Sequence, residues 1–526
     1  MKKVFYFVAS LLILGCGSIK QTSDQTKTNN KSPKGPTTYA ESITEKDLRD
    51  ILYVYASDKF EGRNTGEKGQ KMAIEYLKNF YINHAISAAQ SDDNYFQKVP
   101  LQVSSLPTGL VTVKNENYQV GTDLITLSSV NPKTLSENEV VYAGYGVETD
   151  FYSDYRGIDV KGKIVLIKNG EPKKNDGTNV ISGNDQTSPW GELRSGFSKK
   201  LELAKSKGAK AIFYYAPDAF GQLAMQYLFI KNRASKEITL KESSEENNFS
   251  YFFINEKLAT GLIENINTLD VAKKLGIPIS FHLESEETKN IDSENVIAFI
   301  KGSEKPEEYV VISAHLDHLG MGENGEVYNG ADDDGSGTTA VLEIAEAFKK
   351  AYDEGNGPKR SVVFLHVTGE EKGLLGSEYY SEHPIFPMEN TVVDLNIDMV
   401  GRIDPKYEGN RNYIYLIGAD KLSTDLHNLS EAVNNKYTHI ELDYRYNDEN
   451  DPNRFYYRSD HYNFAKHNVP IIFYFNGTHD DYHQVTDTPD KINYDLLANR
   501  AKLVFYTAWE IANRDERLVV DKAAQE

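Results

Sequence analysis

Residues 309–318 have the sequence YVVISAHLDH, and this segment decides the fold class. Its first six residues are mostly apolar, which is typical of a buried strand, and polar residues that can bind metals follow. Similar apolar runs occur at 296–300, 361–367, 392–397 and 470–475, and helical spacing predicts helices at 338–350 and 494–511. Strands that alternate with helices predict an α/β domain with a mainly parallel mixed sheet and helices on both faces.

Side chains that suit a metal ion follow these predicted strands. They are His315, Glu371, Asp398 and His483. The carboxyl ends of parallel strands share one rim of a sheet, so these residues can converge there. A glycine-flanked loop with three more carboxylates, Asp332 to Asp334, opens the helix predicted at 338–350. Nitrogen and oxygen ligands without any thiolate suit zinc or another first-row divalent ion.

Each of these residues, taken alone, also has an ordinary structural explanation. A histidine in a turn is often satisfied by a nearby aspartate, acidic residues often cap the start of a helix, and adjacent glutamates are common at the surface. The metal-site hypothesis therefore depends on the joint placement of the motifs and on no single one of them.

The order of the motifs resembles that of a known peptidase family. His-x-Asp, Asp-Asp-Gly-Ser-Gly, Gly-Glu-Glu-x-Gly-Leu-x-Gly-Ser, Asp-Met and Tyr-His follow one another between residues 315 and 483. This arrangement is similar to the di-zinc peptidase family that includes bacterial leucyl aminopeptidases, glutamate carboxypeptidase and, more distantly, glutaminyl cyclase. Residues 56–66, ASDKFEGRNTG, resemble the start of members with an inserted protease-associated domain.

The resemblance implies a set of ligands for two Zn²⁺ ions. His315 and Asp398 would hold one ion, Glu371 and His483 the other, and Asp333 would bridge them. Asp333 is chosen from the three adjacent aspartates because the family motif places the ligand directly before Asp-Gly-Ser-Gly.

The resemblance also implies roles for residues that do not bind the metals. Glu370 would be the general base, Asp317 would orient His315, and Tyr482 would stabilise the developing oxyanion. Arg458-Ser459-Asp460-His461 resembles a further family feature near the site. His461 is expected directly behind the metal ligands, and Arg454 or Arg458 would bind a substrate carboxylate or form a surface ion pair.

A metal-dependent exopeptidase acting on peptides is the function that these residues imply. An aminopeptidase is favoured over a carboxypeptidase of the same family, because a lipoprotein with an inserted protease-associated domain resembles the aminopeptidases. Two alternatives stay open: a glutaminyl cyclase, which uses one zinc in this fold, and a non-catalytic, receptor-like binding protein.

The residue spacing and composition predict that the chain is divided into several parts. Residues 41–100 carry helical spacing and would form the N-terminal helical part of the peptidase domain, and residues 286–526 would form its catalytic part. Short strand-like runs between Gly, Asn and Asp turns fill 101–285. Residues 142–146, 159–166 and 205–211 in this stretch resemble the protease-associated domain, usually an insertion without catalytic residues.

The N-terminal residues predict export. Residues 1–15 have a basic start and a short apolar core, as a signal peptide does. The ending Ile13-Leu14-Gly15-Cys16 resembles the bacterial lipobox, so Cys16 is expected to carry a lipid. Residues 16–40 are polar and are expected to be a disordered tether. The chain would then be a membrane-anchored bacterial lipoprotein that faces the periplasm or the cell exterior.

Composition excludes some functions. The formal net charge is −20, and nucleic-acid binding needs a basic surface, so no nucleic-acid partner is expected. Cys16 is the only cysteine, which excludes disulfides within the chain, a cysteine nucleophile in the mature part and thiolate zinc ligands.

Overall fold

The computed structural model describes residues 34–104, 106–128, 130, 135, 138–231, 237–241, 249–284, 289–449 and 451–522. The predicted signal peptide, Cys16 and residues 17–33 of the predicted tether lie outside these residues, so export and lipidation stay predictions. Within the described residues, no helix is both long and apolar enough to span a membrane.

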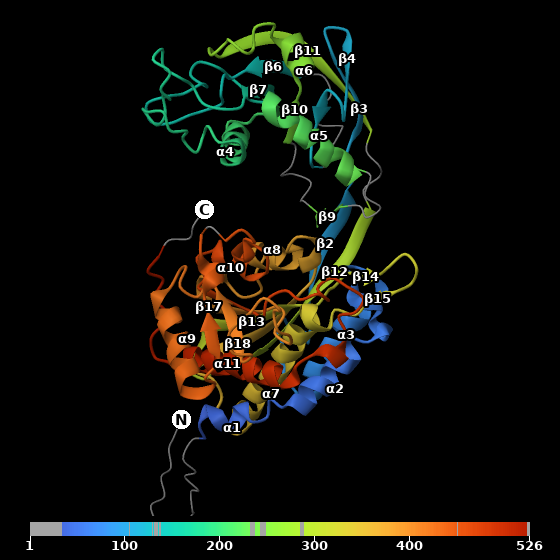
Figure 1. Ribbon diagram of the computed structural model, residues 1–526, viewed down its shortest axis with the longest axis vertical. Helices are drawn as coiled ribbons and strands as arrows, with labels where there is room; N and C mark the ends of the chain where they lie inside the picture. Colours follow the sequence, from blue (N-terminus) through green and yellow to red (C-terminus); the bar gives the residue numbers. More distant parts are fainter. Residues whose placement is uncertain are drawn as a thin grey trace, which may run out of the picture. The chain divides into compact units, whose positions relative to one another are not determined.

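A mixed sheet of ten described strands lies in the part that the sequence predicts to be the peptidase domain (Figure 1). The strands are β1 (Ser87–Ala88), β2 (Phe96–Ser104), β9 (Glu237–Leu240), β12 (Lys289–Ile300), β13 (Lys305–His315), β16 (Arg360–Val367), β17 (Thr391–Ile397), β18 (Tyr413–Ile417), β19 (Glu441–Asp443) and β20 (Ile471–Phe475). Four central strands, in the order β20-β17-β13-β16, run parallel to one another. Their neighbours β12 and β18 pair with them antiparallel. The predicted mixed α/β fold is confirmed, with its parallel part at the centre.

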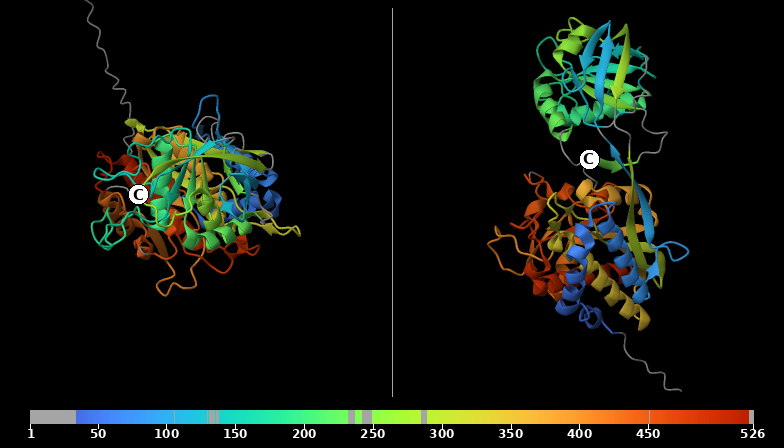
Figure 2. Two further views of the ribbon diagram at one scale, coloured as in Figure 1. Left: turned by 90° about the horizontal axis from the view of Figure 1, so that it is seen from above. Right: turned by 90° about the vertical axis from the view of Figure 1, so that its right-hand side faces the viewer.

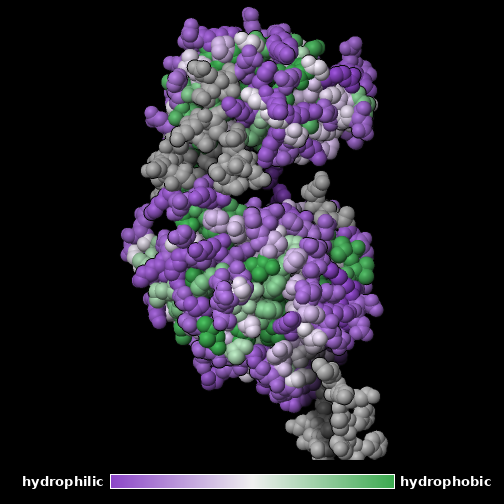
Figure 3. Space-filling model, turned by 180° about the vertical axis from the view of Figure 1, so that it is seen from behind, coloured by the Kyte–Doolittle hydropathy of each residue, from purple (hydrophilic) through white to green (hydrophobic). Residues whose placement is uncertain are grey.

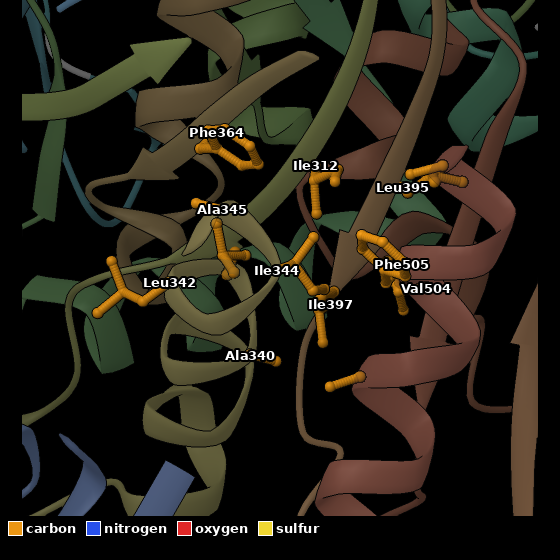
Figure 4. Packing of buried hydrophobic residues seen from close by; sticks show 14 of the residues in the cluster. Ile312, Ala340, Leu342, Ile344, Ala345, Phe364, Leu395, Ile397, Val504 and Phe505 are labelled. Carbon is orange, nitrogen blue, oxygen red and sulfur yellow. The ribbon is translucent and has the colours of Figure 1, made fainter. Parts of the chain in front are cut away.

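Helices cover both faces of this sheet. They are α1 (Pro36–Ala40), α2 (Glu45–Tyr55), α3 (Lys68–Asn83), α7 (Gly337–Asp353), α8 (Leu375–Glu382), α9 (Thr424–Tyr437), α10 (His461–Ala465) and α11 (Tyr494–Asn513). Alternate side chains of β13 point to opposite faces: Val310 and Ile312 pack in the core with α7 and α11, and Val311 packs in the core with α8 and α10. Figure 4 shows Ile312 facing Ile344 of α7 and Phe505 of α11.

The N-terminal helices begin earlier than the sequence predicted. Residues 36–40 form α1, and Tyr39 is fully buried and stacks on Trp509 of α11 with ring centroids 5.6 Å apart. The prediction that the tether extends to residue 40 is therefore wrong for residues 36–40. A single large aromatic residue outweighs a polar neighbourhood, because a buried ring removes much apolar area from water.

A second sheet lies within the predicted insertion. Its strands are β3 (Thr108–Val113), β4 (Glu116–Gln119), β5 (Leu124–Ile125), β6 (Asn138–Tyr142), β7 (Ile164–Lys168), β8 (Ala211–Tyr215), β10 (Ser250–Ile254) and β11 (Lys273–Glu284), and its helices are α4 (Leu193–Ser206), α5 (Pro217–Lys231) and α6 (Glu256–Leu262). These elements share a hydrophobic core of their own. Such a core fits a separate folding unit, and its assignment as a protease-associated domain stays a prediction.

The predicted limits of the insertion, 101 and 285, differ from the strand limits. Strand β2 crosses residue 101 and pairs with β12 from Phe96 to Val103, and the two strands run side by side in Figures 1 and 2. Strand β9, from the middle of the predicted insertion, pairs with the other edge of β2, where Leu101 faces Leu240. This pairing satisfies the backbone groups of β2 that would otherwise form an open edge.

The surface combines hydrophilic residues with smaller hydrophobic areas. Figure 3 shows this mixture on one face of the molecule. Such a distribution is usual for globular proteins, since apolar atoms contribute more than half of a typical folded surface.

Candidate metal centre and active site

The central strands deliver the predicted ligands to one rim of the sheet. His315 is the last residue of β13, Asp398 directly follows β17, and Glu371 lies in the short turn η4 (Glu370–Lys372) after β16. Asp333 lies in the turn η3 (Ala331–Ser336) that leads into α7, and His483 lies in the loop after β20. All four strands are parallel, so their carboxyl ends meet at the same edge.

His315, Asp333 and Asp398 form the first cluster. His315 Nε2 lies 3.1 Å from Asp333 Oδ1 and 3.6 Å from Asp398 Oδ1. The other ring nitrogen of His315, Nδ1, donates to the backbone oxygen of Asp317 at 3.0 Å. This hydrogen bond places the proton on Nδ1 and leaves the Nε2 lone pair free to bind a cation.

His483, Asp333 and Glu371 form the second cluster. His483 Nε2 lies 3.1 Å from Asp333 Oδ2 and 3.2 Å from Glu371 Oε2. Asp333 therefore turns one carboxylate oxygen to each cluster. This is the arrangement that a carboxylate shared by two cations requires.

The two aspartates beside Asp333 are occupied by hydrogen bonds. Asp334 accepts from the backbone N–H groups of His315, Gly337 and Met399 at 3.2, 2.9 and 3.2 Å. Asp332 accepts from the Gly401 N–H, the Ser336 hydroxyl, the Asn476 amide and His479 Nε2. Asp334 also lies within ligand distance of His315 and Asp398. Because both of its oxygens already accept, we assign it to holding the loop together.

The atoms of the two clusters fit divalent cations. Among the described residues, the buried atoms His315 Nε2, Asp333 Oδ2 and Glu371 Oε1 have no hydrogen-bond partner. Buried polar atoms without partners are rare and costly, and three of them that converge indicate a missing positive charge. Nitrogen and carboxylate oxygen donors suit Zn²⁺, as the sequence predicted. The individual ligand roles stay predictions.

Asp317 contacts His315 through its main chain. Its backbone oxygen, and not its carboxylate, orients His315. The carboxylate is fully buried and accepts from Thr65 Oγ1 at 2.6 Å and from the Glu370 N–H at 3.1 Å. Asp317 thus fixes the loop that carries Glu370, because its position two residues after the strand end points the side chain toward η4.

Glu370 borders the pocket beside the clusters. Asp333, Asp398 and Tyr482 line the same pocket. Burial raises the pKa of Glu370 well above its usual value, and the carboxylates of Asp398 and Glu371 add to the rise while His315 opposes it. A carboxyl group with a raised pKa beside the reacting atoms suits a group that takes up and returns a proton.

Tyr482 lies against the second cluster. Its ring stacks on His483 with centroids 3.9 Å apart. Burial, followed by the nearby Asp333 and Glu371 carboxylates, raises the pKa of the Tyr482 phenol. The phenol therefore stays protonated and can donate a hydrogen bond into the pocket.

The Arg458-Ser459-Asp460-His461 segment divides into three environments. Arg458 is exposed and lines the pocket beside Phe455. Asp460 is fully buried and accepts from Ser377 Oγ at 2.5 Å, and burial raises its pKa to about 7. The Nε2 atom of His461 donates to the Tyr456 backbone oxygen, and its ring stacks on Phe473, which lines the pocket.

Sequence reasoning missed several residues that support the site. Ser459 donates to Asp398 Oδ2 at 2.7 Å, and Asp487 accepts from the backbone N–H groups of Asp332 and Asp333. Arg63 is buried and donates to backbone oxygens of the loops that carry the clusters. His318, from the same motif as His315, lies 2.8 Å from Glu371. Two of these residues could have been found from the sequence: His318 is the second histidine of the HLDH motif, and Ser459 is the serine of the RSDH segment.

The α/β fold and the paired clusters of nitrogen and oxygen donors define the class, an α/β domain with a candidate two-metal site. Residues 295–508 match the model of peptidase family M28.

Comparisons with individual proteins give partial matches. The chain is 26% identical over 300 residues to a glutamate carboxypeptidase 2 homolog of Caenorhabditis elegans, a match that covers 50% of this chain and 37% of the relative. It is 36% identical over 113 residues to carboxypeptidase Q of Xenopus laevis, covering 21% of this chain and 22% of the relative. The chain thus matches well under half the length of these curated relatives. Among solved structures, an aminopeptidase from Aneurinibacillus sp. strain AM-1 aligns over 94% of this chain and 100% of its own, with 20% identity and a TM-score of 0.46.

Proposed function

We propose that the protein is a two-metal exopeptidase, most specifically an aminopeptidase that removes N-terminal residues from peptides. One observation carries the proposal: Asp333 offers one oxygen to each cluster, and Glu370 borders the same pocket. Paired cations on a shared carboxylate, with a base beside them, are typical of metal-assisted hydrolysis.

Two divalent cations bound at the clusters would polarise the scissile carbonyl and acidify a water molecule. In our proposal the Glu370 carboxylate takes a proton from the attacking water as its oxygen bonds to the carbonyl carbon. Glu370 then returns this proton to the leaving nitrogen as the C–N bond breaks. The products are a free carboxylate and a free amine.

Tyr482 would act on the carbonyl oxygen. Its protonated phenol stands at the edge of the pocket with Glu370 and the carboxylates of the clusters. A hydrogen bond from this phenol strengthens as negative charge builds on the carbonyl oxygen, so it favours the transition state over the bound substrate.

The walls of the pocket suit an apolar side chain. Met399, Phe455, Phe473 and Phe475 line it, and Phe473 is backed by the stacked ring of His461. Apolar and aromatic walls bury a side chain of similar character. We therefore propose that the residue released from the peptide is hydrophobic.

The charges in the pocket bear on which peptide end it accepts. Three carboxylates, Asp333, Glu370 and Asp398, line it, and they suit the ammonium group of a peptide N-terminus. A carboxypeptidase is the second candidate, because Arg458 also lines the pocket and a guanidinium can bind a terminal carboxylate.

Dipeptides with blocked ends test these alternatives. Purified protein is assayed with free, N-acetylated and C-amidated leucine dipeptides, before chelation, after it, and with zinc restored. An aminopeptidase cleaves the amidated but not the acetylated substrate, whereas the reverse pattern indicates a carboxypeptidase. Activity that is indifferent to chelation contradicts the metal mechanism altogether.

We also propose that the protein is exported and anchored to a membrane through a lipid on Cys16, as the N-terminal sequence indicates. Membrane fractionation of cells that express the full chain or its Cys16→Ser variant tests this. Both forms in the soluble fraction would contradict the anchor.

A further inference from the structure

The ring of His318 stands next to the second cluster, and among the described residues neither of its nitrogens has a hydrogen-bond partner. His318 follows β13 by three residues and is fully buried. Its Nδ1 lies 2.8 Å from Glu371 Oε1 and 3.8 Å from Asp333 Oδ2. The ring also meets that of His483 edge-on, with centroids 5.8 Å apart.

The short distance between His318 and Glu371 is not that of an aligned hydrogen bond. Among the described residues, His318 Nδ1 and Glu371 Oε1 both lack a hydrogen-bond partner although they are neighbours. His315 Nε2 and Asp333 Oδ2, which are predicted ligand atoms, lack partners in the same way. Two polar atoms that are close but not directed at each other can both point at a third atom between them.

The distances agree with a shared cation. Zinc binds nitrogen and oxygen at about 2.0–2.2 Å, which puts neighbouring ligand atoms about 3–3.5 Å apart in common geometries. The contacts within this group are 2.8 Å from His318 to Glu371, 3.1 Å from His483 to Asp333 and 3.2 Å from His483 to Glu371. His318, Asp333 and Glu371 also form a group whose ligand atoms all lie within 4.8 Å of one another.

We infer that His318 is an additional ligand of the second metal ion, a role that the family motifs do not assign. The inference rests on the two-metal site of the proposed function and deepens it. The second ion then has four protein ligands, His318, Asp333, Glu371 and His483. The first ion has three protein ligands, and Asp333 is a ligand of both ions.

This difference predicts the order in which the sites fill. Two neutral imidazoles and two carboxylates hold the second ion, whereas one imidazole and two carboxylates hold the first. The second site therefore binds its ion more tightly and is the first to fill in a metal titration.

Metal titration of the apoprotein tests the inference without reference to activity. Co²⁺ is added to wild-type protein and to His318→Ala, with absorption spectra recorded and affinities measured by competition with a chelator. We expect His318→Ala to lower the affinity for one of the two ions by at least about tenfold and to leave the affinity for the other unchanged. The absorption spectrum of the weakened site should also change. The control is His366→Gln, which removes a buried histidine that pairs with Tyr81.

Two unchanged affinities and an unchanged spectrum in His318→Ala would overturn the inference. X-ray absorption of the wild-type di-zinc protein covers the case in which the variant does not fold. The inference is supported if the two ions together have three imidazole ligands, those of His315, His318 and His483. A total of two imidazole ligands would overturn it. Failure of the proposed function is recognised separately, because the dipeptide assay would then show no metal-dependent cleavage whatever the imidazole count.

Discussion

The hydroxyl of Ser459 donates to Asp398 Oδ2 at 2.7 Å, while the other oxygen of Asp398 faces His315. The same hydroxyl accepts from the Asn396 amide at 2.9 Å. Asn396 is on β17, just before Asp398, so a buried hydrogen-bond chain fixes the carboxylate to the strand that carries it. A carboxylate held in this way needs no reorientation when a cation binds.

Removal of this hydroxyl weakens the first metal site. In Ser459→Ala, Asp398 keeps its charge but loses the donor that fixes its plane, so we expect the affinity of the first site to fall about tenfold or more. Chelator competition measures the loss. Ser381→Ala, which removes another buried serine hydroxyl from helix α8, is the matched control. Equal metal affinities in all three proteins would contradict the positioning role.

Glu370→Gln separates metal binding from proton transfer. Glutamine keeps the size of the side chain but cannot accept a proton at neutral pH, so we expect turnover to fall by about 10²–10⁴-fold. The metal content should stay at the wild-type value, because Glu370 is in neither cluster. Elemental analysis and steady-state kinetics check the two parts, and unchanged kinetics would remove Glu370 as the base.

Asp333 and Asp334 are expected to respond differently to the same substitution. Asp333→Asn should lower the affinity of both sites for their metal ions, because each cluster loses one charged oxygen. Asp334→Asn should mainly lower the free energy of unfolding, since an intramolecular hydrogen bond contributes about 0.5–1.5 kcal/mol and Asp334 accepts three. Metal titration and thermal unfolding of the two variants measure this contrast, and two identical profiles would contradict it.

Chelation should destabilise the catalytic part. Without cations, the buried carboxylates Asp333, Glu371 and Asp398 and their neighbour Glu370 repel one another. Ligand binding to the native state stabilises it by a few kcal/mol when the ligand is far above its dissociation constant. Differential scanning calorimetry should show a lower transition temperature after chelation and its recovery with Zn²⁺. A transition that chelation leaves unmoved would contradict binding at these clusters.

We expect Lys200 to make the stability of the second sheet depend on pH. It is buried, its Nζ donates to the Gly170 backbone oxygen at 2.6 Å, and burial lowers its pKa to about 7, with Asp154 and Glu171 opposing the shift. The unfolded chain, with the usual lysine pKa of about 10.4, binds more protons between these two pKa values. Stability contributed by this group therefore rises with pH from about 7 to about 10.

Lys200→Met tests this dependence. The variant lacks the titrating group, so its stability relative to wild type should be highest below pH 7 and should fall by a few kcal/mol toward pH 10, at about 1.4 kcal/mol per pKa unit. Hydrogen exchange of peptides from β7 and β8 reports on this sheet alone. A difference between the two proteins that does not vary with pH would refute the expected titration.

Much of the fold could be predicted because its signals are local. The apolar runs at 361–367 and 392–397 became β16 and β17 within one residue at each end, and helical spacing located α7 and α11. The tether prediction failed at Tyr39, because composition does not show that one ring will stack on Trp509, 470 positions further along the chain. The return of β9 to the large sheet was missed for the same reason, since strand pairing is not local.

The sequence by itself determined that metal-compatible residues follow parallel strands, in the order of a known peptidase family. Strand periodicity and motif spacing contain that information. Only the tertiary structure decided that Asp333 turns one oxygen to each cluster while Asp332 and Asp334 are held by hydrogen bonds, and only it brought His318 beside Glu371. The direction of a side chain depends on the neighbours that pack against it, and those neighbours come from distant parts of the chain.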